Sequence, residues 1–152
     1  MAPLRLFTDG SANPASRIGY GAYLALTDTG MEPEVQLKRF ENTSSSQLEV
    51  ETLIWALHAL QPKAVTVYTD SQNILGLSGR RNRFEERGYL TNRNNPVKHA
   101  DLYREFFNLT EQIDCTFVKV KGHRVSRHKT DIDRLFTLVD RAARQALRDH
   151  FR

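Results

Sequence analysis

Alternating apolar and polar positions open the chain and predict β-strands. Residues 4–7 alternate and lead into the turn-forming run TDGSANP, and residues 18–27 and 35–43 are two further runs that suit strands. The run TDTGMEPE between the second and third of these stretches is turn-like, which favours hairpin connections. We therefore expect three consecutive antiparallel strands at the start of the chain.

Apolar positions then change to helical spacing and predict a helix over residues 44–60, which Pro62 ends. Serine residues at its start can cap this helix, and acidic residues in its first turn would complement the helix dipole. Its apolar positions are Leu48, Leu53, Ile54, Leu57 and Leu60.

Strands and helices alternate in the second half of the chain. The expected elements are a strand over 64–69, a short helix over 71–79, a helix over 98–113, a strand over 115–122 and a helix over 130–151. The intervening residues 80–96 are polar and basic, so we expect a projecting, solvated segment there. This order of elements predicts an α/β fold with one mixed sheet covered by helices.

One domain is expected over residues 1–152, because this length matches a single domain of ordinary size and no repeat or flexible linker interrupts it. No stretch approaches the roughly 20 apolar residues of a membrane span, and the N-terminus lacks a long apolar signal region. The single cysteine, Cys115, cannot form an internal disulfide, and its apolar surroundings favour burial. We expect a cytoplasmic protein, with a monomer as the default because no heptad seam is present.

The charge balance favours a polyanionic partner. The formal net charge is +4 and the pI is about 9.4. Charge of this sign bears on association rather than on fold. Nucleic acid is the leading partner, and an acidic membrane surface is the weaker alternative.

Two predicted strands end in an aspartate, and these carboxylates are the first candidates for catalysis. Asp9 follows the first strand and Asp70 follows the strand over 64–69. If the two strands are neighbours, the carboxylates lie side by side and repel unless a cation or a proton separates them. Oxygen ligands suit Mg²⁺ or Mn²⁺, and a pair of such ions can catalyse phosphodiester hydrolysis.

Glu49 could supply a third carboxylate, because it lies one turn into the predicted helix. The spacing alone leaves two readings open. A glutamate near a helix start often serves only to complement the helix dipole, and Glu51 shares this ambiguity.

Five motifs in order carry a resemblance to the bacterial type 1 ribonuclease H family. They are TDGS with Asp9, the helix with Glu49, TDSQ with Asp70, VKGH with His123 and VDRAAR with Asp140. The resemblance spans about residues 4–147. It implies a ribonuclease H-like, five-stranded mixed sheet in the order 3-2-1-4-5.

The resemblance also implies an activity, namely endonucleolytic hydrolysis of the RNA strand of an RNA/DNA hybrid that leaves 3′-hydroxyl and 5′-phosphate ends. Asp9, Glu49, Asp70 and Asp140 would bind two Mg²⁺ ions, with Mn²⁺ as an alternative. His123 would act as a general acid or base near neutral pH.

Short polar side chains suit the shallow minor groove of a hybrid, where the 2′-hydroxyls are displayed. By resemblance the substrate-binding candidates are Gly10, Ser11, Asn13, Ser45, Ser46, Gln47, Ser71 and Gln72. Each of them can also be an ordinary loop or helix-cap residue.

The segment over about 80–98 resembles the basic handle of the bacterial family. Its cations could grip phosphates of the DNA strand, and an ordinary solvated surface is the alternative. The family's handle is commonly rich in tryptophan, so Phe84 and Tyr89 would have to substitute, and His99 replaces an asparagine. The cationic candidates are Arg80, Arg81, Arg83, Arg87, Arg93 and Lys98.

Two further alternatives stay open. The loop after His123 departs from the family pattern, so the fourth carboxylate is either Asp140, which fits the local motif and is preferred, or Asp133, which fits the more familiar distance from the histidine. In function, the alternatives to the enzyme are a hybrid-binding module without catalysis and another nuclease of the same fold. Four acids that repel a polyanionic ligand argue against the pure binding module.

Overall fold

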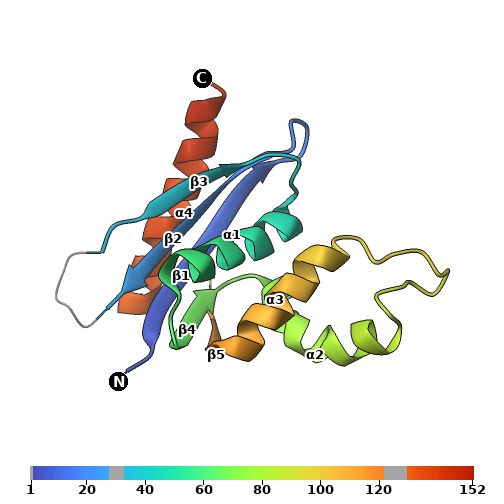
Figure 1. The fold of residues 1–152 in the computed structure, drawn as a ribbon. Coiled ribbons are helices and arrows are strands. Elements are labelled where there is room, and N and C mark those ends of the chain that lie inside the picture. Colours follow the sequence, from blue (N-terminus) through green and yellow to red (C-terminus); the bar gives the residue numbers. More distant parts are fainter. Residues whose placement is uncertain (1, 28–32, 122–129) are drawn as a thin grey trace.

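The computed structural model describes residues 2–27, 33–121 and 130–152, and it contains one five-stranded sheet. The strand order is β3-β2-β1-β4-β5, with the first three strands antiparallel and β1, β4 and β5 parallel (Figure 1). The predicted mixed sheet and its order are confirmed. The strands are β1 (Leu4–Asn13), β2 (Ile18–Leu26), β3 (Gln36–Phe40), β4 (Ala64–Thr69) and β5 (Asp114–Lys119).

Helices cover both faces of the sheet (Figure 1). The helices α1, α2 and α3 lie on one face, and α4 packs on the other face against β1 and β2. None of the described helices has both the length and the apolar character that a bilayer-spanning segment requires. The bounds are α1 (Ser45–Leu60), α2 (Gln72–Glu86), α3 (Ala100–Gln112) and α4 (Asp131–His150).

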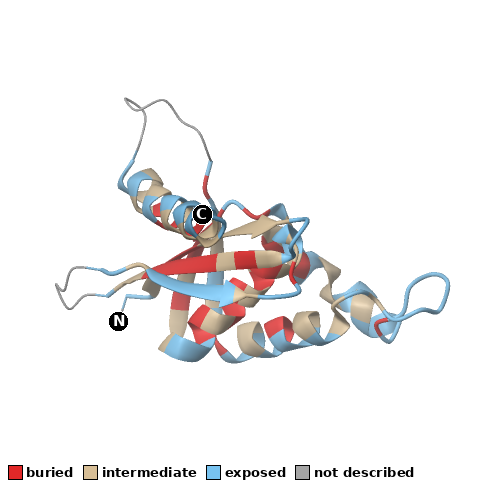
Figure 2. Cartoon of the chain, turned by 90° about the horizontal axis from the view of Figure 1, so that it is seen from above, coloured by how far each residue is buried: buried red, intermediate tan, exposed pale blue. Residues whose placement is uncertain are grey.

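Two apolar cores lie on opposite faces of the sheet because successive side chains of a strand alternate in direction. In β1, Leu6 belongs to the core that includes Leu53 of α1, whereas the next residue, Phe7, belongs to the core that includes Val139 of α4. Figure 2 shows the buried residues gathered along the strands and on the inward sides of the helices. The central strand is thereby fixed from both sides.

The first strand is longer than predicted. Its pairing with β4 ends at Phe7↔Tyr68, but its pairing with β2 continues to Asn13↔Ile18. The run TDGSANP is therefore mostly strand rather than loop, because the β2 hairpin satisfies its backbone on one side. Asp9 consequently lies inside β1 and not after it.

The helix α1 has the predicted extent and serine cap, but the composition of its first turn differs from the prediction. Ser44 is its N-cap, and the hydroxyl of Ser44 accepts the N–H of Gln47 at 3.4 Å. Ser45 and Ser46 are exposed residues of the first turn, and no acidic residue lies in that turn. The expectation of acids complementing the dipole in the first turn is wrong.

The helix α2 also differs from the prediction, since it continues to Glu86 instead of ending near residue 79. It ends in a Schellman motif, in which the N–H of Tyr89 bonds to the carbonyl of Phe84 at 2.8 Å and the N–H of Gly88, at φ 59°, bonds to Glu85. The rings of Phe84 and Tyr89 stack at 5.7 Å, and Phe84 also stacks on Tyr103 of α3 at 5.5 Å. The segment expected to be only solvated is therefore anchored to the core by its aromatic residues.

Candidate active site

The parallel pairing of β1 with β4 brings Asp9 and Asp70 to the same end of the sheet. The paired residues run from Leu4↔Val65 to Phe7↔Tyr68. Asp9 lies two residues after Phe7, and Asp70 lies two residues after Tyr68. The two strands are neighbours, as the sequence argument required. Asp9 is partly buried, whereas Asp70 is exposed.

The carboxyl of Asp140, on helix α4, contacts that of Asp9. Asp9 points to the same face of the sheet as Phe7, which is the face that α4 covers, and its carboxyl is hydrogen-bonded to that of Asp140. Burial, this hydrogen bond and the charge of Asp70 together raise the pKa of Asp9 to about 8. One proton therefore sits between Asp9 and Asp140 at neutral pH in the absence of a cation.

Asp133 lies in a different environment from Asp140. It is the third residue of α4 and forms a capping box with Thr130: Asp133 accepts the backbone N–H of Thr130 at 3.0 Å and donates its own N–H to the Thr130 hydroxyl. Asp140 lies further along α4 and forms an ion pair with Nε of Arg144 at 3.0 Å. Between the two candidates for a fourth carboxylate, the geometry favours Asp140.

Glu49 reaches the site from α1. Its Oε2 accepts a hydrogen bond from the hydroxyl of Ser71 at 2.5 Å. Burial and the charge of Asp70 raise the pKa of Glu49, while the bond from Ser71 opposes that rise. Glu51 is used differently, because it accepts the hydroxyl of Thr43 at 2.5 Å. The contacts therefore distinguish the two glutamates as candidate ligands. Of the two, only Glu49 is bonded to a residue next to Asp70.

The close packing of α1 on the sheet holds Glu49 near the ends of β1 and β4. Gly10 of β1 pairs with Gly21 of β2, and both lie beneath α1. A Cβ on Gly10 would lie 2.9 Å from Leu48, and one on Gly21 would collide with Thr52. Gly10, expected to contact substrate, has this packing role.

The site has the donor chemistry of a divalent-metal site but not a completed set of ligands. Within the described residues, no three acidic, histidine or cysteine side chains converge closely enough to hold an ion as they stand. The donors that meet are carboxylate oxygens, the ligands that Mg²⁺ prefers. The pKa of Asp9 is raised first by burial and then by the Asp140 hydrogen bond and the charge of Asp70, and a cation in place of the proton would relieve the repulsion among these carboxylates.

The substrate-binding candidates separate into exposed and internal side chains. Ser45, Ser46 and Gln72 are exposed near the carboxylates, at the starts of α1 and α2. Ser71 is buried, and the side chain of Asn13 accepts two backbone N–H groups of the turn that follows it. Ser11 and Gln47 are partly buried, and Gln47 Oε1 is a buried oxygen without a hydrogen-bond partner in the described structure.

Two of the handle arginines, Arg80 and Arg81, are partly buried and have partners on the helices. Arg80 donates to the carbonyl and to Oδ1 of Asn73 at 2.9 and 2.7 Å, and Arg81 pairs with Glu85 at 2.8 Å and Glu111 at 3.2 Å.

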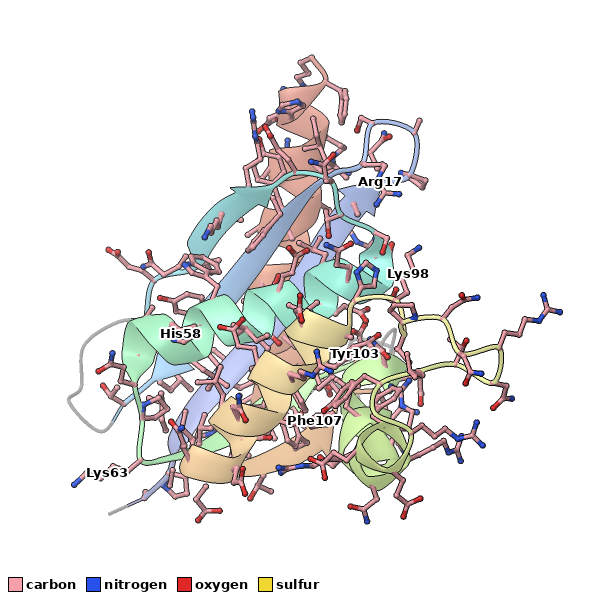
Figure 3. All side chains as sticks on the ribbon, turned by 45° about the vertical axis from the view of Figure 1, so that its right-hand side comes forward. Arg17, His58, Lys63, Lys98, Tyr103 and Phe107 are labelled. Atoms are coloured by element: carbon pink, nitrogen blue, oxygen red, sulfur yellow. The ribbon has the colours of Figure 1, made fainter. Side chains whose placement is uncertain are left out.

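The other handle cations are exposed. Arg87 bonds to Asn92, while Arg83, Arg93 and Lys98 form no ion pair within the described parts of the chain. Figure 3 shows Lys98 at the end of the handle where the chain enters α3, near the start of α1 and on the same side as Arg17.

Three features of this region were absent from the sequence predictions. The first is Arg17. Burial is the largest cause that lowers the pKa of the His99 imidazole, and the positive charges of Lys98 and Arg17 lower it further. Arg144 was detectable as a cation four residues after Asp140. The bond from Ser71 to Glu49 has no sequence signal, because it joins two elements.

His123, the expected general acid or base, lies outside the described residues.

A family model and curated relatives agree on one family, and a solved structure of lower sequence identity has the same fold. The RNase H family model matches residues 2–148. A ribonuclease H of Moorella thermoacetica is 32% identical, covering 97% of this chain and 95% of that protein, and one of Lachnoclostridium phytofermentans is 34% identical over 78% and 79%. The solution structure of the PFV RNase H domain superposes with a TM-score of 0.71 at 21% identity, covering 93% and 92%. The chain belongs to the ribonuclease H family.

Proposed function

We propose that this ribonuclease H is an endonuclease that hydrolyses the RNA strand of RNA/DNA hybrids with two divalent metal ions, leaving 3′-hydroxyl and 5′-phosphate ends. Membership of the family supports the enzyme class and the hybrid substrate. The observation that carries the mechanism is the contact between the carboxyls of Asp9 and Asp140 beside the charge of Asp70.

In this proposal Asp9, Glu49, Asp70 and Asp140 hold the ions, which are Mg²⁺ or, alternatively, Mn²⁺. The chemistry supplied by bound divalent ions is stabilisation of the attacking and leaving oxygens during in-line displacement at phosphorus. The protein's own contribution is to hold its carboxylates on separate elements, so that negative charge is concentrated where a cation is needed. Without a cation the same charge would repel a polyanionic substrate, which argues against a pure binding module.

His123 is proposed as the general acid or base that assists proton transfer. The exposed side chains of Ser45, Ser46 and Gln72 are proposed to contact 2′-hydroxyls, since they flank the carboxylates at the starts of α1 and α2. The exposed cations Arg83, Arg87, Arg93 and Lys98 are proposed to contact phosphates of the DNA strand.

The test uses one labelled sequence prepared as an RNA/DNA hybrid, an RNA duplex and a DNA duplex, together with a labelled four-way DNA junction. Each is incubated with the protein in Mg²⁺ or in chelator, and the product ends are mapped. Cleavage of the hybrid's RNA strand alone, abolished by chelator, is the expected result. Hybrid binding without cleavage in any divalent metal would overturn the proposal in favour of a binding module. Preferential cleavage of a four-way junction would point instead to a different nuclease of this fold.

A further inference from the structure

Ser71 is enclosed by hydrogen bonds at the junction of β4 and α2. Its hydroxyl donates to Oε2 of Glu49 at 2.5 Å and accepts the N–H of Ile74 at 3.1 Å as the N-cap of α2. Its own N–H donates to Oγ1 of Thr69 at 3.1 Å. With Ser71 only 3% exposed, the hydroxyl reaches Glu49 and not a bound duplex.

The bond from Ser71 to Glu49 connects the start of α2 to α1, and further hydrogen bonds reinforce this joint between the two helices. Nδ2 of Asn73 donates to the carbonyl of Ser46 at 3.3 Å, and Nη2 of Arg80 donates to Oδ1 of Asn73 at 2.7 Å. These contacts hold the start of α2 against the first turns of α1. The hydroxyl of Ser71 is thus fixed by its surroundings, and not by Glu49 alone.

The direction of the bond follows from the chemistry of a hydroxyl. Its single proton goes to the carboxylate, because the N–H of Ile74 can only donate and therefore occupies a lone pair. A glutamate side chain has several rotatable bonds, and fixing it costs conformational entropy. A buried donor on one carboxylate oxygen restricts that freedom before any ligand arrives.

We infer that Ser71 is a positioning residue for Glu49: it holds Oε2 and thereby presents the other oxygen, Oε1, to the carboxylate site. The inference rests on the proposed function, since it assumes that Glu49 is a metal ligand. It assigns to Ser71 an action through Glu49 in place of a contact with RNA.

The main test measures Mg²⁺ affinity by isothermal titration calorimetry, without substrate, for the wild type, Ser71→Gly and Ser71→Thr. Glycine is a nearly adequate N-cap, so Ser71→Gly removes the donor to Glu49 with little loss of the cap. Removing a residue that orients a metal ligand typically weakens binding about 10- to 100-fold, and we expect a reduction in this range. Ser71→Thr keeps the hydroxyl and should keep most of the affinity. Equal affinity of Ser71→Gly and the wild type would overturn the inference.

Two controls separate positioning from general destabilisation. Thr130→Ala removes the N-cap hydroxyl of α4, the helix that carries Asp140, without touching Glu49. It should lower thermal stability and leave Mg²⁺ affinity unchanged, and a reduction matching that of Ser71→Gly would overturn the inference. In a Glu49→Ala background, Ser71→Gly should cause no further reduction, whereas an additive reduction would assign Ser71 a different role. A wild type that binds no Mg²⁺ would overturn the proposed function itself, and so is distinguishable from failure of the Ser71 variants alone.

Discussion

The carboxyl groups of Asp9 and Asp140 share a hydrogen bond between the central strand of the sheet and the helix that covers its far face. Asp140 is the tenth residue of α4, about two and a half turns from the helix start. Two carboxyls in contact require a proton or a cation between them. The fold therefore concentrates negative charge at this point at some cost to its own stability.

Asp9→Asn should abolish cleavage of the hybrid and stabilise the metal-free protein. The amide keeps the size of the side chain and is neutral without binding a proton, whereas the Asp9 carboxyl must take up a proton when the chain folds at neutral pH, so the cost of burying this side chain falls. We expect the free energy of unfolding in chelator to rise by roughly 1–2 kcal/mol, the usual range for relieving a destabilised site. Urea denaturation and a hybrid cleavage assay measure the two effects. Retained turnover would contradict the assignment of Asp9 to the metal site.

Asp140→Asn and Asp133→Asn form a matched pair on α4. Asp140 contacts Asp9, so its amide variant should lose nearly all cleavage. Asp133 belongs to the capping box, and its variant should keep cleavage while losing about 0.5–1 kcal/mol of stability, the order of one cap interaction. Steady-state cleavage rates and thermal unfolding separate the two. The reverse pattern of cleavage rates would make Asp133 the fourth carboxylate.

Stability without metal should fall as the pH rises. The pKa of Asp9 is about 8 in the fold against an ordinary value of 3.8, so the folded state binds this proton more tightly than the unfolded chain. The stabilisation is fully present below about pH 4 and disappears as the pH rises through about 8. The raised pKa of Glu49 acts in the same direction.

The measurement for this prediction compares the free energy of unfolding in chelator at about pH 5 and about pH 9. The wild type should lose more stability over this range than Asp9→Asn, which has no proton to release at that position. Equal decreases in the two proteins would show that the pKa of Asp9 is not raised. Because Mg²⁺ competes with the proton, its affinity for the wild type should also rise with pH over the same range.

The sheet order was predicted through the family resemblance, and the candidate carboxylates were identified from motifs that each lie within one element. Asp9 and Asp70 follow apolar strand residues, and Asp140 sits in a helix with a clear apolar face. What the sequence could not provide were contacts between elements. The choice between Asp140 and Asp133 depended on where α4 starts and which of its residues faces Asp9. The bond from Ser71 to Glu49 depended on how α1 packs against α2.

The extent of α2 shows the same limit in local structure. Residues 80–86 read as polar and basic, yet they continue the helix, because Phe84 stacks on both Tyr89 and Tyr103 of α3. Tertiary contacts of this kind override a weak local pattern. For the same reason, Arg80 and Arg81 were expected to be free for phosphates but are bonded within the protein.

Gly10→Ala tests how tightly α1 packs on the sheet, and Gly79→Ala is its control. Gly10→Ala would place a Cβ 2.9 Å from Leu48, and overpacking of this kind costs about 1–3 kcal/mol. Gly79→Ala, in α2, would meet no atom within 4 Å and should stabilise the protein by about 0.5–1 kcal/mol through helix propensity. Thermal unfolding of both variants checks the pair. A neutral Gly10→Ala would mean that α1 can move away from the sheet, and Glu49 would then be less firmly placed than the structure shows.

Exposed and internal arginines of the handle should differ in their effect on hybrid binding. Arg83 and Arg93 are exposed and form no ion pair within the described residues, so their combined replacement by alanine should weaken binding. The slope of log affinity against log salt should become shallower by about 1 for each phosphate that the variant no longer binds. Arg80→Ala is the matched control, because Arg80 is bonded to Asn73. It should leave the salt slope unchanged and lower the free energy of unfolding by about 1 kcal/mol.

Fluorescence anisotropy with a hybrid across a series of salt concentrations, in chelator to prevent cleavage, measures both slopes. If the Arg83 and Arg93 variant keeps the slope of the wild type, these residues form an ordinary solvated surface and the DNA strand is held elsewhere. If Arg80→Ala flattens the slope instead, Arg80 must leave Asn73 when the duplex binds. That exchange would also loosen the joint between α1 and α2, so hybrid binding and the position of Glu49 would then be coupled through α2.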